Sequence, residues 1–516
     1  MINIASILDI SARRCPEATA FVHRDRRTGF GELERLASRI ANGLVAEGFG
    51  PGSRIALCSQ NRIAVPAAYF GILKTGATVV MINAHATRRD IDQGLRDSGA
   101  EALLCQTRLY GEEVPGAVFE AFEANEGCRR LWLLPETLEP DPAASLEQVC
   151  GYPTLARLMQ GRSDRFETAA VAPDDVAVIA FTSGTTGRRK AVQTMHRNIA
   201  AMVMITAQLG PAEDCRVRVT SNTLDCLMGQ VYMLVSPVYM GHCVVLLDDD
   251  DPLGVLGAVL RWGGTYLIDS PIAFDRMLEV AGQVDCAAIR RTLRICVTGG
   301  AGMAKDLSER FEATFGAPLL PGYGATETTT AITWTCPGDS ARPGSVGRPI
   351  PGVTVRVLDP EGRPCPAGEA GEVWVRSPGI MKGYLDMPEA TERTLVEGWY
   401  RTSDLGHLGE DGSLYVHRRL DNKIIQGIDQ IDPLEVESIL LEHPAIHEAR
   451  VVAEPDPRLG QRARSFVVLE NRQRADQADL LGWLQSELPY GKAPETLEIV
   501  ATLPAGGAAS PITRRI

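Results

Sequence analysis

The chain has 516 residues, of which 45% are hydrophobic and 23% are charged, a balance typical of water-soluble globular proteins. A single hydrophobic core rarely serves a chain of this length, so we expect about two to four folding units. The net charge of −13 at pH 7 argues against nucleic acid as a partner.

Strand-like apolar runs alternate with helix-length amphipathic segments in the N-terminal part of the chain. We expect helices at residues 30–47 and 305–315, and strands at residues 54–58, 77–82, 176–181, 243–247 and 293–297. This alternation is typical of α/β proteins with parallel, doubly wound sheets. Such sheets bind ligands at the carboxyl ends of their strands, where Phe181 and Thr298 lie.

Residues 226–247 contain no Asp, Glu, Lys or Arg and are long enough to cross a membrane as a helix. Gly229, Pro237 and Gly241 interrupt this run, so we expect a buried helix followed by a buried strand and no membrane span. The N-terminus lacks the continuous apolar stretch of a signal peptide. The 12 cysteines include no Cys-x-x-Cys pair, which favours reduced thiols and a cytoplasmic protein.

The pattern changes after residue 350, where short strands at residues 353–358 and 371–376 alternate with Gly/Pro turns. They predict a β-rich lobe that completes a large N-terminal domain, residues 1–420. Residues 421–516 predict a small α+β domain that acts as a mobile lid. We expect its strands at residues 448–452 and 463–469 and its helices at residues 433–442 and 475–488.

Residues 181–192 read Phe-Thr-Ser-Gly-Thr-Thr-Gly-Arg-Arg-Lys-Ala-Val and follow one of the expected strands. Glycine allows a sharp turn and a close approach to a ligand, while hydroxyls, turning amides and a lysine suit a phosphate group. The Walker pattern does not fit this loop. The predicted phosphate-binding residues are Thr182, Ser183, Gly184, Thr185, Thr186, Gly187 and Lys190.

Further motifs follow in a fixed order along the chain. They are residues 298–302 (Thr-Gly-Gly-Ala-Gly), 322–327 (Gly-Tyr-Gly-Ala-Thr-Glu), 371–373 (Gly-Glu-Val), 382–384 (Lys-Gly-Tyr), 399–404 (Trp-Tyr-Arg-Thr-Ser-Asp) and 419–421 (Arg-Leu-Asp). With the loop, they resemble the adenylate-forming superfamily of acyl-CoA synthetases, peptide-synthetase adenylation domains and luciferases. The resemblance covers nearly the whole chain. It departs at Arg189, Ala191 and Ser403, where the family usually has Pro, Gly and Gly.

The resemblance implies that a carboxylate attacks the α-phosphorus of ATP, which gives an acyl-adenylate and pyrophosphate. Catalysis of this step consists of charge screening and alignment. Glu327 would bind Mg²⁺ and Thr326 the α-phosphate, while Lys190 would hold the β- and γ-phosphates. The predicted nucleoside-binding residues are Gly300, Ala301, Gly302 and Tyr323 for adenine, Asp404 for the ribose hydroxyls and Arg419 for phosphate or ribose.

The lysine that usually ends such a chain is missing here. Depending on the alignment, Ser510 or Pro511 takes its place, and no lysine follows Lys492. Loss of one preorganised charge donor costs on the order of 10²–10³ in rate. Adenylation is therefore slow, or another cation supplies the charge: Arg514 or Arg515, or Lys190 together with Arg188 and Arg189.

Two further departures concern the acceptor and the acid. Ile428 replaces a glycine whose bare backbone lines the pantetheine tunnel in thioester-forming members. Asp225 or Cys226 stands where many members carry an aromatic-His pair near the acyl pocket. We expect this pocket at residues 222–231, 270–274 and 328–332.

These departures leave several activities open. We favour an amide ligase, similar to the coronafacate-type branch, in which a small amine such as an amino acid attacks the adenylate. An acyl-CoA synthetase that tolerates the changes is the main alternative. A homologue that binds nucleotide or acyl ligand without turnover and a carrier-protein loading enzyme complete the set.

Overall fold

The computed structural model of the protein describes most of the chain. The described residues are 3–83, 86–106, 108–109, 112–113, 116–135, 151–182, 189–209, 216–300, 302–304, 306–338, 342–420, 423–427, 429–456, 458–470, 475–489, 491–504 and 512–513.

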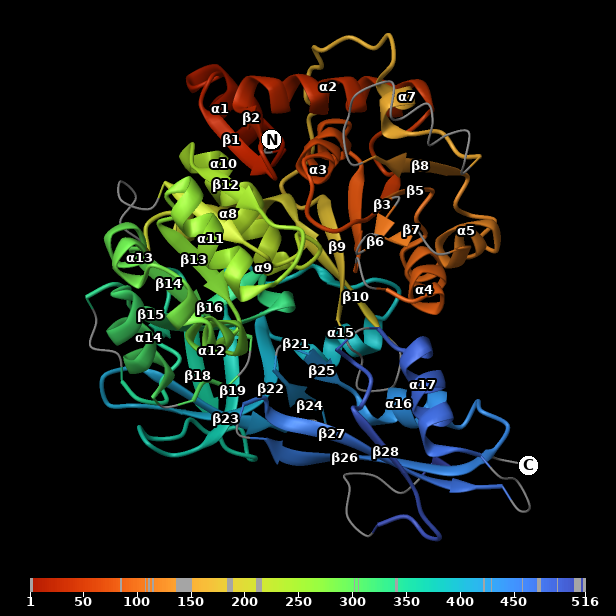
Figure 1. The fold of residues 1–516 in the computed structure, drawn as a ribbon, viewed down its shortest axis with the longest axis vertical. Helices are drawn as coiled ribbons and strands as arrows, with labels where there is room; N and C mark the ends of the chain where they lie inside the picture. Colours follow the sequence, from red (N-terminus) through yellow and green to blue (C-terminus); the bar gives the residue numbers. More distant parts are fainter. Residues whose placement is uncertain are drawn as a thin grey trace.

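Two large sheets form the N-terminal domain (Figure 1). The first has nine strands in the order β17-β16-β15-β14-β13-β11-β12-β1-β2 and is parallel from β15 to β1. Its strands are β1 (Thr19–His23), β2 (Arg26–Gly29), β11 (Val217–Thr220), β12 (Cys243–Leu246), β13 (Tyr266–Asp269), β14 (Ile295–Thr298), β15 (Leu319–Ala325), β16 (Thr330–Trp334) and β17 (Arg348–Pro349).

The second sheet has seven strands in the order β20-β10-β9-β4-β3-β5-β8. It is parallel from β9 to β8, and β10 and β20 add two antiparallel strands at one edge. Its strands are β3 (Arg54–Cys58), β4 (Thr78–Ile82), β5 (Ala102–Gln106), β8 (Arg130–Leu134), β9 (Val176–Thr182), β10 (Lys190–Met195) and β20 (Gly383–Tyr384). A separate short pair joins β6 (Arg108–Leu109) to β7 (Glu112–Glu113).

Helices pack on these sheets, as parallel strands require. One hydrophobic core runs between the two sheets and includes residues of α2, α3, α8 and a π-helix. The helices are α1 (Ser6–Arg14), α2 (Phe30–Ala46), α3 (Ala64–Lys74), α4 (Arg88–Ser98), α5 (Gly116–Glu123), α7 (Leu155–Met159), α8 (His196–Thr206), α9 (Leu227–Gly229), the π-helix (Gln230–Val235), α10 (Ser236–Met240), α11 (Pro252–Trp262), α12 (Pro271–Glu279), a 3-10 turn (Ala281–Gln283), α13 (Cys286–Thr292) and α14 (Leu307–Phe315).

The β-rich lobe and the C-terminal domain follow (Figure 1). The lobe is one antiparallel sheet of β18 (Thr354–Leu358), β19 (Gly371–Arg376), β21 (Leu395–Val396), β22 (Trp399–Leu408) and β23 (Leu414–Arg419), with α15 (Pro388–Thr394) beside it. The C-terminal domain contains β24 (Ile424–Gln426), β25 (Asp429–Ile431), α16 (Pro433–Leu440), β26 (Ile446–Asp456), β27 (Gly460–Leu469), α17 (Gln477–Glu487), β28 (Thr496–Ile499) and β29 (Ile512–Thr513).

The predicted fold class is confirmed. The strands expected at residues 54–58 and 371–376 begin and end where we predicted, and the other elements differ by a few residues. The C-terminal domain has its own hydrophobic core, which includes Val436, Leu440 and Leu484. The division after residue 420 stays a prediction, since Asp421 lies outside the described residues.

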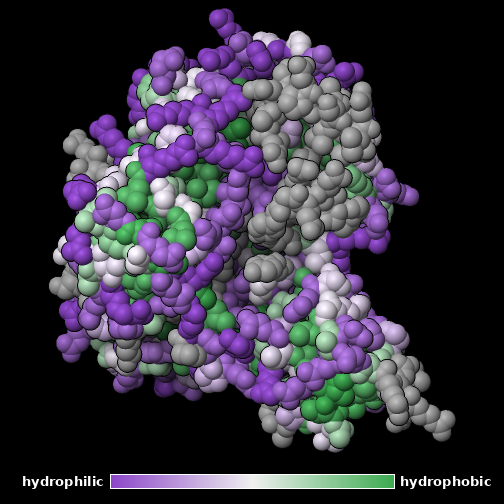
Figure 2. Space-filling model, in the orientation of Figure 1, coloured by the Kyte–Doolittle hydropathy of each residue, from purple (hydrophilic) through white to green (hydrophobic). Residues whose placement is uncertain are grey.

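Residues 226–247 form α9, the π-helix, α10 and then the buried strand β12, as expected. Gly241 ends α10 with a φ of 76°, a conformation that glycine adopts without penalty. In the part of the chain that the structure describes, no helix is both long and apolar enough to span a membrane. Figure 2 shows hydrophilic residues over much of this face, with apolar areas on both the N-terminal and the C-terminal domain.

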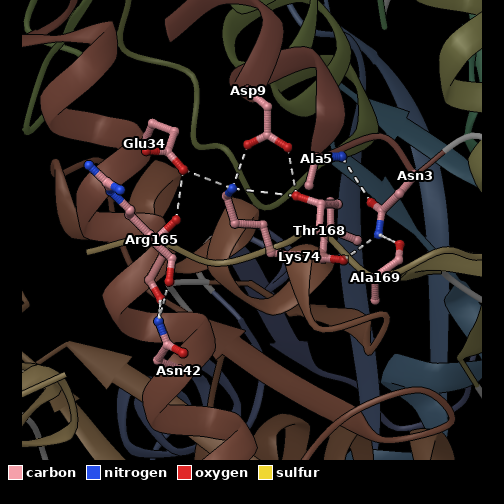
Figure 3. A network of polar contacts seen from close by, with 11 residues as sticks. Asn3, Ala5, Asp9, Glu34, Asn42, Lys74, Arg165, Thr168 and Ala169 are labelled. Carbon is pink, nitrogen blue, oxygen red and sulfur yellow. Dashed lines mark hydrogen bonds and ion pairs between the residues drawn. The ribbon is translucent and has the colours of Figure 1, made fainter. Parts of the chain in front are cut away.

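A buried charge network ties the first helices together (Figure 3). The last residue of α3, Lys74, is fully buried and donates to Asp9 of α1, to Glu34 Oε1 of α2 at 3.0 Å and to Thr168 Oγ1 at 3.4 Å. Thr168 Oγ1 also donates to Asp9 Oδ2 at 2.6 Å. Lys74 therefore fixes α1, α2 and the segment before β9 to one point.

We expect Lys74→Met to lower the free energy of unfolding by about 3 kcal/mol or more, because two carboxylates lose their buried cation. The apparent Tm, measured by calorimetry, should fall accordingly. Arg96→Gln is the control, because it removes a surface ion pair with Asp92 (2.9 Å) that is worth less than about 1 kcal/mol. Equal Tm values for the two variants would contradict this assignment.

Candidate active site

The strands that flank the predicted phosphate loop form an antiparallel pair. Thr182, the last residue of β9, lies opposite Lys190, the first residue of β10. The backbone therefore leaves and re-enters the sheet at one point. The predicted phosphate-binding residues Ser183, Gly184, Thr185, Thr186 and Gly187, and also Arg188, lie outside the described residues.

Tyr384 joins two of the predicted catalytic residues. The Lys190 ammonium lies over the ring of Tyr384, 4.9 Å from the ring centre. The Tyr384 hydroxyl donates to Glu327 Oε1 at 2.7 Å. Glu327 lies in a 3-10 turn (Thr326–Thr328) that also contains Thr326. Burial, and then the charge of Glu327, raises the pKa of Tyr384 far above its ordinary value, so the hydroxyl remains a donor at neutral pH.

A second group joins the predicted nucleoside-binding residues. Tyr323 donates its hydroxyl hydrogen to Asp404 Oδ2, and Asp404 Oδ1 lies 3.4 Å from Arg419 Nη1. Asp404 and Arg419 are also paired across β22 and β23. Burial, and then the charge of Asp404, raises the pKa of Tyr323 well above its ordinary value. The group is thus a partly buried donor, a buried anion and a cation in series.

The two groups belong to one continuous segment. Tyr323, which contacts Asp404, lies four residues before Glu327, which contacts Tyr384. The expected segment after β14 lies beside this one, because a Cβ on Gly299 would come within 2.9 Å of the Gly322 carbonyl oxygen. The structure therefore places the start of the motif at residues 298–302 beside the motif at residues 322–327.

The glycines after β14 differ in their surroundings within the protein. Gly300 has a φ of 83°, which residues other than glycine rarely adopt. A Cβ added to Gly302 would meet no atom within 4 Å. The close backbone approach inside the protein falls on Gly299. Ala301 lies outside the described residues.

The backbone after Glu327 is strained. Thr329 and Thr330 have φ values of 52° and 98°, which are rare for β-branched residues. Thr329 Oγ1 donates to the Gly379 carbonyl oxygen at 2.6 Å, and Thr330 Oγ1 donates to Tyr232 Oη at 3.2 Å. Tyr232 belongs to the π-helix, so parts of the expected acyl pocket at residues 328–332 lie against this helix.

The predicted magnesium site offers one protein carboxylate. Among the described residues, no group of three or more His, Cys, Asp or Glu side chains is placed to hold a metal ion. Glu327 Oε1 accepts from Tyr384, which orients the carboxylate and leaves its other oxygen for a cation. This fits Mg²⁺, which usually binds one or two carboxylates together with phosphate oxygens and water.

Sequence reasoning missed the contacts that Tyr384 and Arg189 make with distant residues. Tyr384 was only part of a Lys-Gly-Tyr motif, and nothing local signals a bond to a residue 57 positions away. We expected Arg189 to assist Lys190 with phosphate charge. The structure instead places its guanidinium against Asp90 at 2.6 Å. Arg514 and Arg515, the other suggested cations, lie outside the described residues.

Ser403 carries a conformational cost at this site. It precedes Asp404, stands where the family usually has glycine, and has a φ of 60°. We expect Ser403→Gly to raise the free energy of unfolding by about 1 kcal/mol, because glycine adopts this φ without a Cβ clash. Ser403→Ala keeps the Cβ and should bring no such gain. A Tm for Ser403→Gly at or below that of Ser403→Ala would refute the assignment.

Comparison with known proteins agrees with this geometry. The AMP-binding enzyme family model matches residues 8–385, and the model of the AMP-binding enzyme C-terminal domain matches residues 435–508. A feruloyl-CoA synthase from Amycolatopsis sp is 31% identical over 96% of this chain and 94% of its own length.

Two solved structures extend the comparison. The amide bond synthetase McbA from Marinactinospora thermotolerans superposes with a TM-score of 0.86 and 26% identity, covering 99% of this chain and 98% of its own. ATP-bound MatB from Rhodopseudomonas palustris gives a TM-score of 0.71 and 25% identity, covering 98% and 96%. This chain belongs to the AMP-binding enzyme family and is an adenylate-forming ligase.

Proposed function

We propose that this chain activates a carboxylic acid with ATP and transfers the acyl group to a small amine, such as an amino acid. In the first step a carboxylate oxygen attacks the α-phosphorus, and pyrophosphate leaves. In the second step the amine nitrogen attacks the acyl carbon, AMP leaves with the bridging oxygen, and the amine loses a proton to form an amide.

The linked contacts of Tyr323 and Glu327 carry the proposal for the first step. Asp404, with Tyr323 and Arg419 as its partners, is a buried anion suited to the ribose hydroxyls. Glu327 contacts the hydroxyl of Tyr384, and Lys190 lies over its ring. A Mg²⁺ ion and the phosphates that it binds would therefore lie near both charged groups. Such preorganised charges stabilise the negative charge that develops during phosphoryl chemistry.

The sequence departures support the amine acceptor. No lysine follows Lys492, and Ile428, which lies outside the described residues, stands at the expected tunnel glycine. An amine can attack an exposed adenylate without a pantetheine tunnel, and so depends less on either feature. The likeness to the amide bond synthetase McbA over nearly the whole of both chains agrees with this acceptor.

CoA is the second candidate acceptor, and one observation favours it. The feruloyl-CoA synthase from Amycolatopsis sp is similar to this chain along almost its entire length. The name of that relative states a CoA product, so the comparisons support CoA as well as an amine as the acceptor.

Product analysis separates the candidates. We expect pyrophosphate release with at least one acid of an aromatic and aliphatic panel, and an amide when mixed amino acids are present. Mass spectrometry after incubation with the amino acids, with CoA, or with hydroxylamine as a general trap identifies the acceptor. Efficient acyl-CoA formation would overturn the amide proposal, and silence across the whole panel would indicate a binding protein without turnover.

Tyr384→Phe tests the assigned roles of Glu327 and Lys190. The variant keeps the ring under Lys190 but removes the hydrogen bond to the Glu327 carboxylate, which is worth about 1.5–3 kcal/mol. We therefore expect pyrophosphate release to slow by about 10-fold to 100-fold, and the Mg²⁺ concentration for half-maximal rate to rise. Glu327→Gln should be slower still.

Tyr415→Phe provides the control, because Tyr415 is only partly buried in β23 and stacks on His407. Its pyrophosphate release should equal that of the unaltered protein. An unchanged rate in Tyr384→Phe, or in Glu327→Gln, would show that the carboxylate does not serve the reaction.

A further inference from the structure

A cluster of charged side chains joins the two domains beside Lys190. Arg189 Nη2 lies 2.6 Å from Asp90 Oδ1 of α4, and Arg189 Nε lies 3.9 Å from Glu435 Oε1 of α16. The exposed fractions of the three side chains are only 13%, 10% and 14%. We call Arg189, Asp90 and Glu435 the interdomain triad, in which one cation of the N-terminal domain serves a carboxylate of each domain.

The Asp90 end of the triad is rigid. Asp90 Oδ2 accepts from the Thr87 backbone N–H at 2.9 Å and from Thr87 Oγ1 at 2.8 Å, while the Asp90 N–H donates back to Thr87 Oγ1. This capping box fixes the carboxylate at the start of α4. The other carboxylate oxygen of Asp90 contacts Arg189, so Asp90 anchors the guanidinium to the N-terminal domain.

The Glu435 end belongs to the C-terminal domain. Glu435 lies in the first turn of α16, which Asp432 caps. Burial raises its pKa, while the charges of Lys492 and Arg189 lower it. Lys492 is also within electrostatic reach of Asp90 and Asp429. This carboxylate therefore depends on cations of both domains for its charge.

Arg189 and Lys190 are consecutive but serve different partners. Lys190 lies over Tyr384, on the side of Glu327, whereas Arg189 reaches Asp90 and Glu435. Side chains of consecutive residues in extended backbone point to opposite sides. A shift of this backbone toward phosphate at Lys190 must therefore change the distance from Arg189 to Glu435, which is already long at 3.9 Å.

We propose that Arg189 is a positioning residue, which links phosphate binding at Lys190 to the pose of the C-terminal domain through Glu435. The inference rests on the proposed function, because it requires that Lys190 binds nucleotide phosphate. Where the family usually has proline, this chain has a side chain that connects the phosphate loop to the mobile domain.

Limited trypsin digestion tests the proposal, because Arg418 is exposed beside the domain boundary. In the unaltered protein, Mg²⁺ with α,β-methylene-ATP should slow cleavage there. In Arg189→Gln and in Glu435→Gln we expect this protection to disappear. Overall product formation should fall by about 2-fold to 30-fold, while ATP–pyrophosphate exchange changes by less than about 2-fold. The double variant should resemble either single variant.

Arg89→Gln is the matched control. Arg89 also belongs to α4 and pairs with Glu442 of the C-terminal domain at 2.8 Å, but both side chains are exposed, by 43% and 52%. Its protection and rates should stay within about 2-fold of the unaltered protein. Arg189→Lys should restore part of the protection, which a purely structural loss would not predict.

Two outcomes would overturn the positioning role. One is nucleotide protection in Arg189→Gln equal to that of the unaltered protein. The other is an equal fall of pyrophosphate exchange and product formation together with a lower Tm. If the unaltered protein released no pyrophosphate with any acid, the proposed function would fail, yet the trypsin comparison would still show whether Arg189 couples nucleotide to the domain pose.

Discussion

The antiparallel position of β10, between β9 and β20, is the constraint on which the site depends. Its register places Lys190 opposite Thr182 and Val192 opposite Tyr384. One strand therefore sets the end of the phosphate loop, the aromatic ring under the lysine and the tyrosine hydroxyl that meets Glu327. Because sheet hydrogen bonds fix this register, the charges of the site are held without a bound ligand, as electrostatic preorganisation requires.

Three of the six non-glycine residues with positive φ in the described part of the chain lie near these charges. Ser403, Thr329 and Thr330 all have positive φ values, and each lies within three residues of Asp404 or Glu327. Each such conformation costs on the order of 1–3 kcal/mol and persists only where the surrounding contacts determine it. Here the contacts are the Thr329 hydroxyl on the Gly379 carbonyl and the Ser403 carbonyl on the Leu420 N–H. The fold stabilises a geometry that the local sequence disfavours.

The sequence predicted the fold class and singled out candidate site residues, but it did not predict the contacts between distant residues. Apolar periodicity located β3 and β19 because a buried strand leaves a local pattern. Motifs located Tyr323, Glu327 and Asp404, since spacing within a motif is local as well. The bond between Tyr384 and Glu327 depends on how two sheets meet, which no local pattern encodes. Residues 183–188 and 428, central to the sequence argument, lie outside the described residues.

The distribution of partners decides which cation is useful to the reaction. Arg189 faces two carboxylates, and Arg419 lies beside Asp404, so much of each charge is offset where it stands. Lys190 lies over the ring of Tyr384, a cation–π contact worth about 0.5–2 kcal/mol. Under the proposed function, Lys190 and a Mg²⁺ ion bound by Glu327 would supply positive charge to the phosphates. In that case the position of the Lys190 charge depends on how firmly β10 is held between β9 and β20.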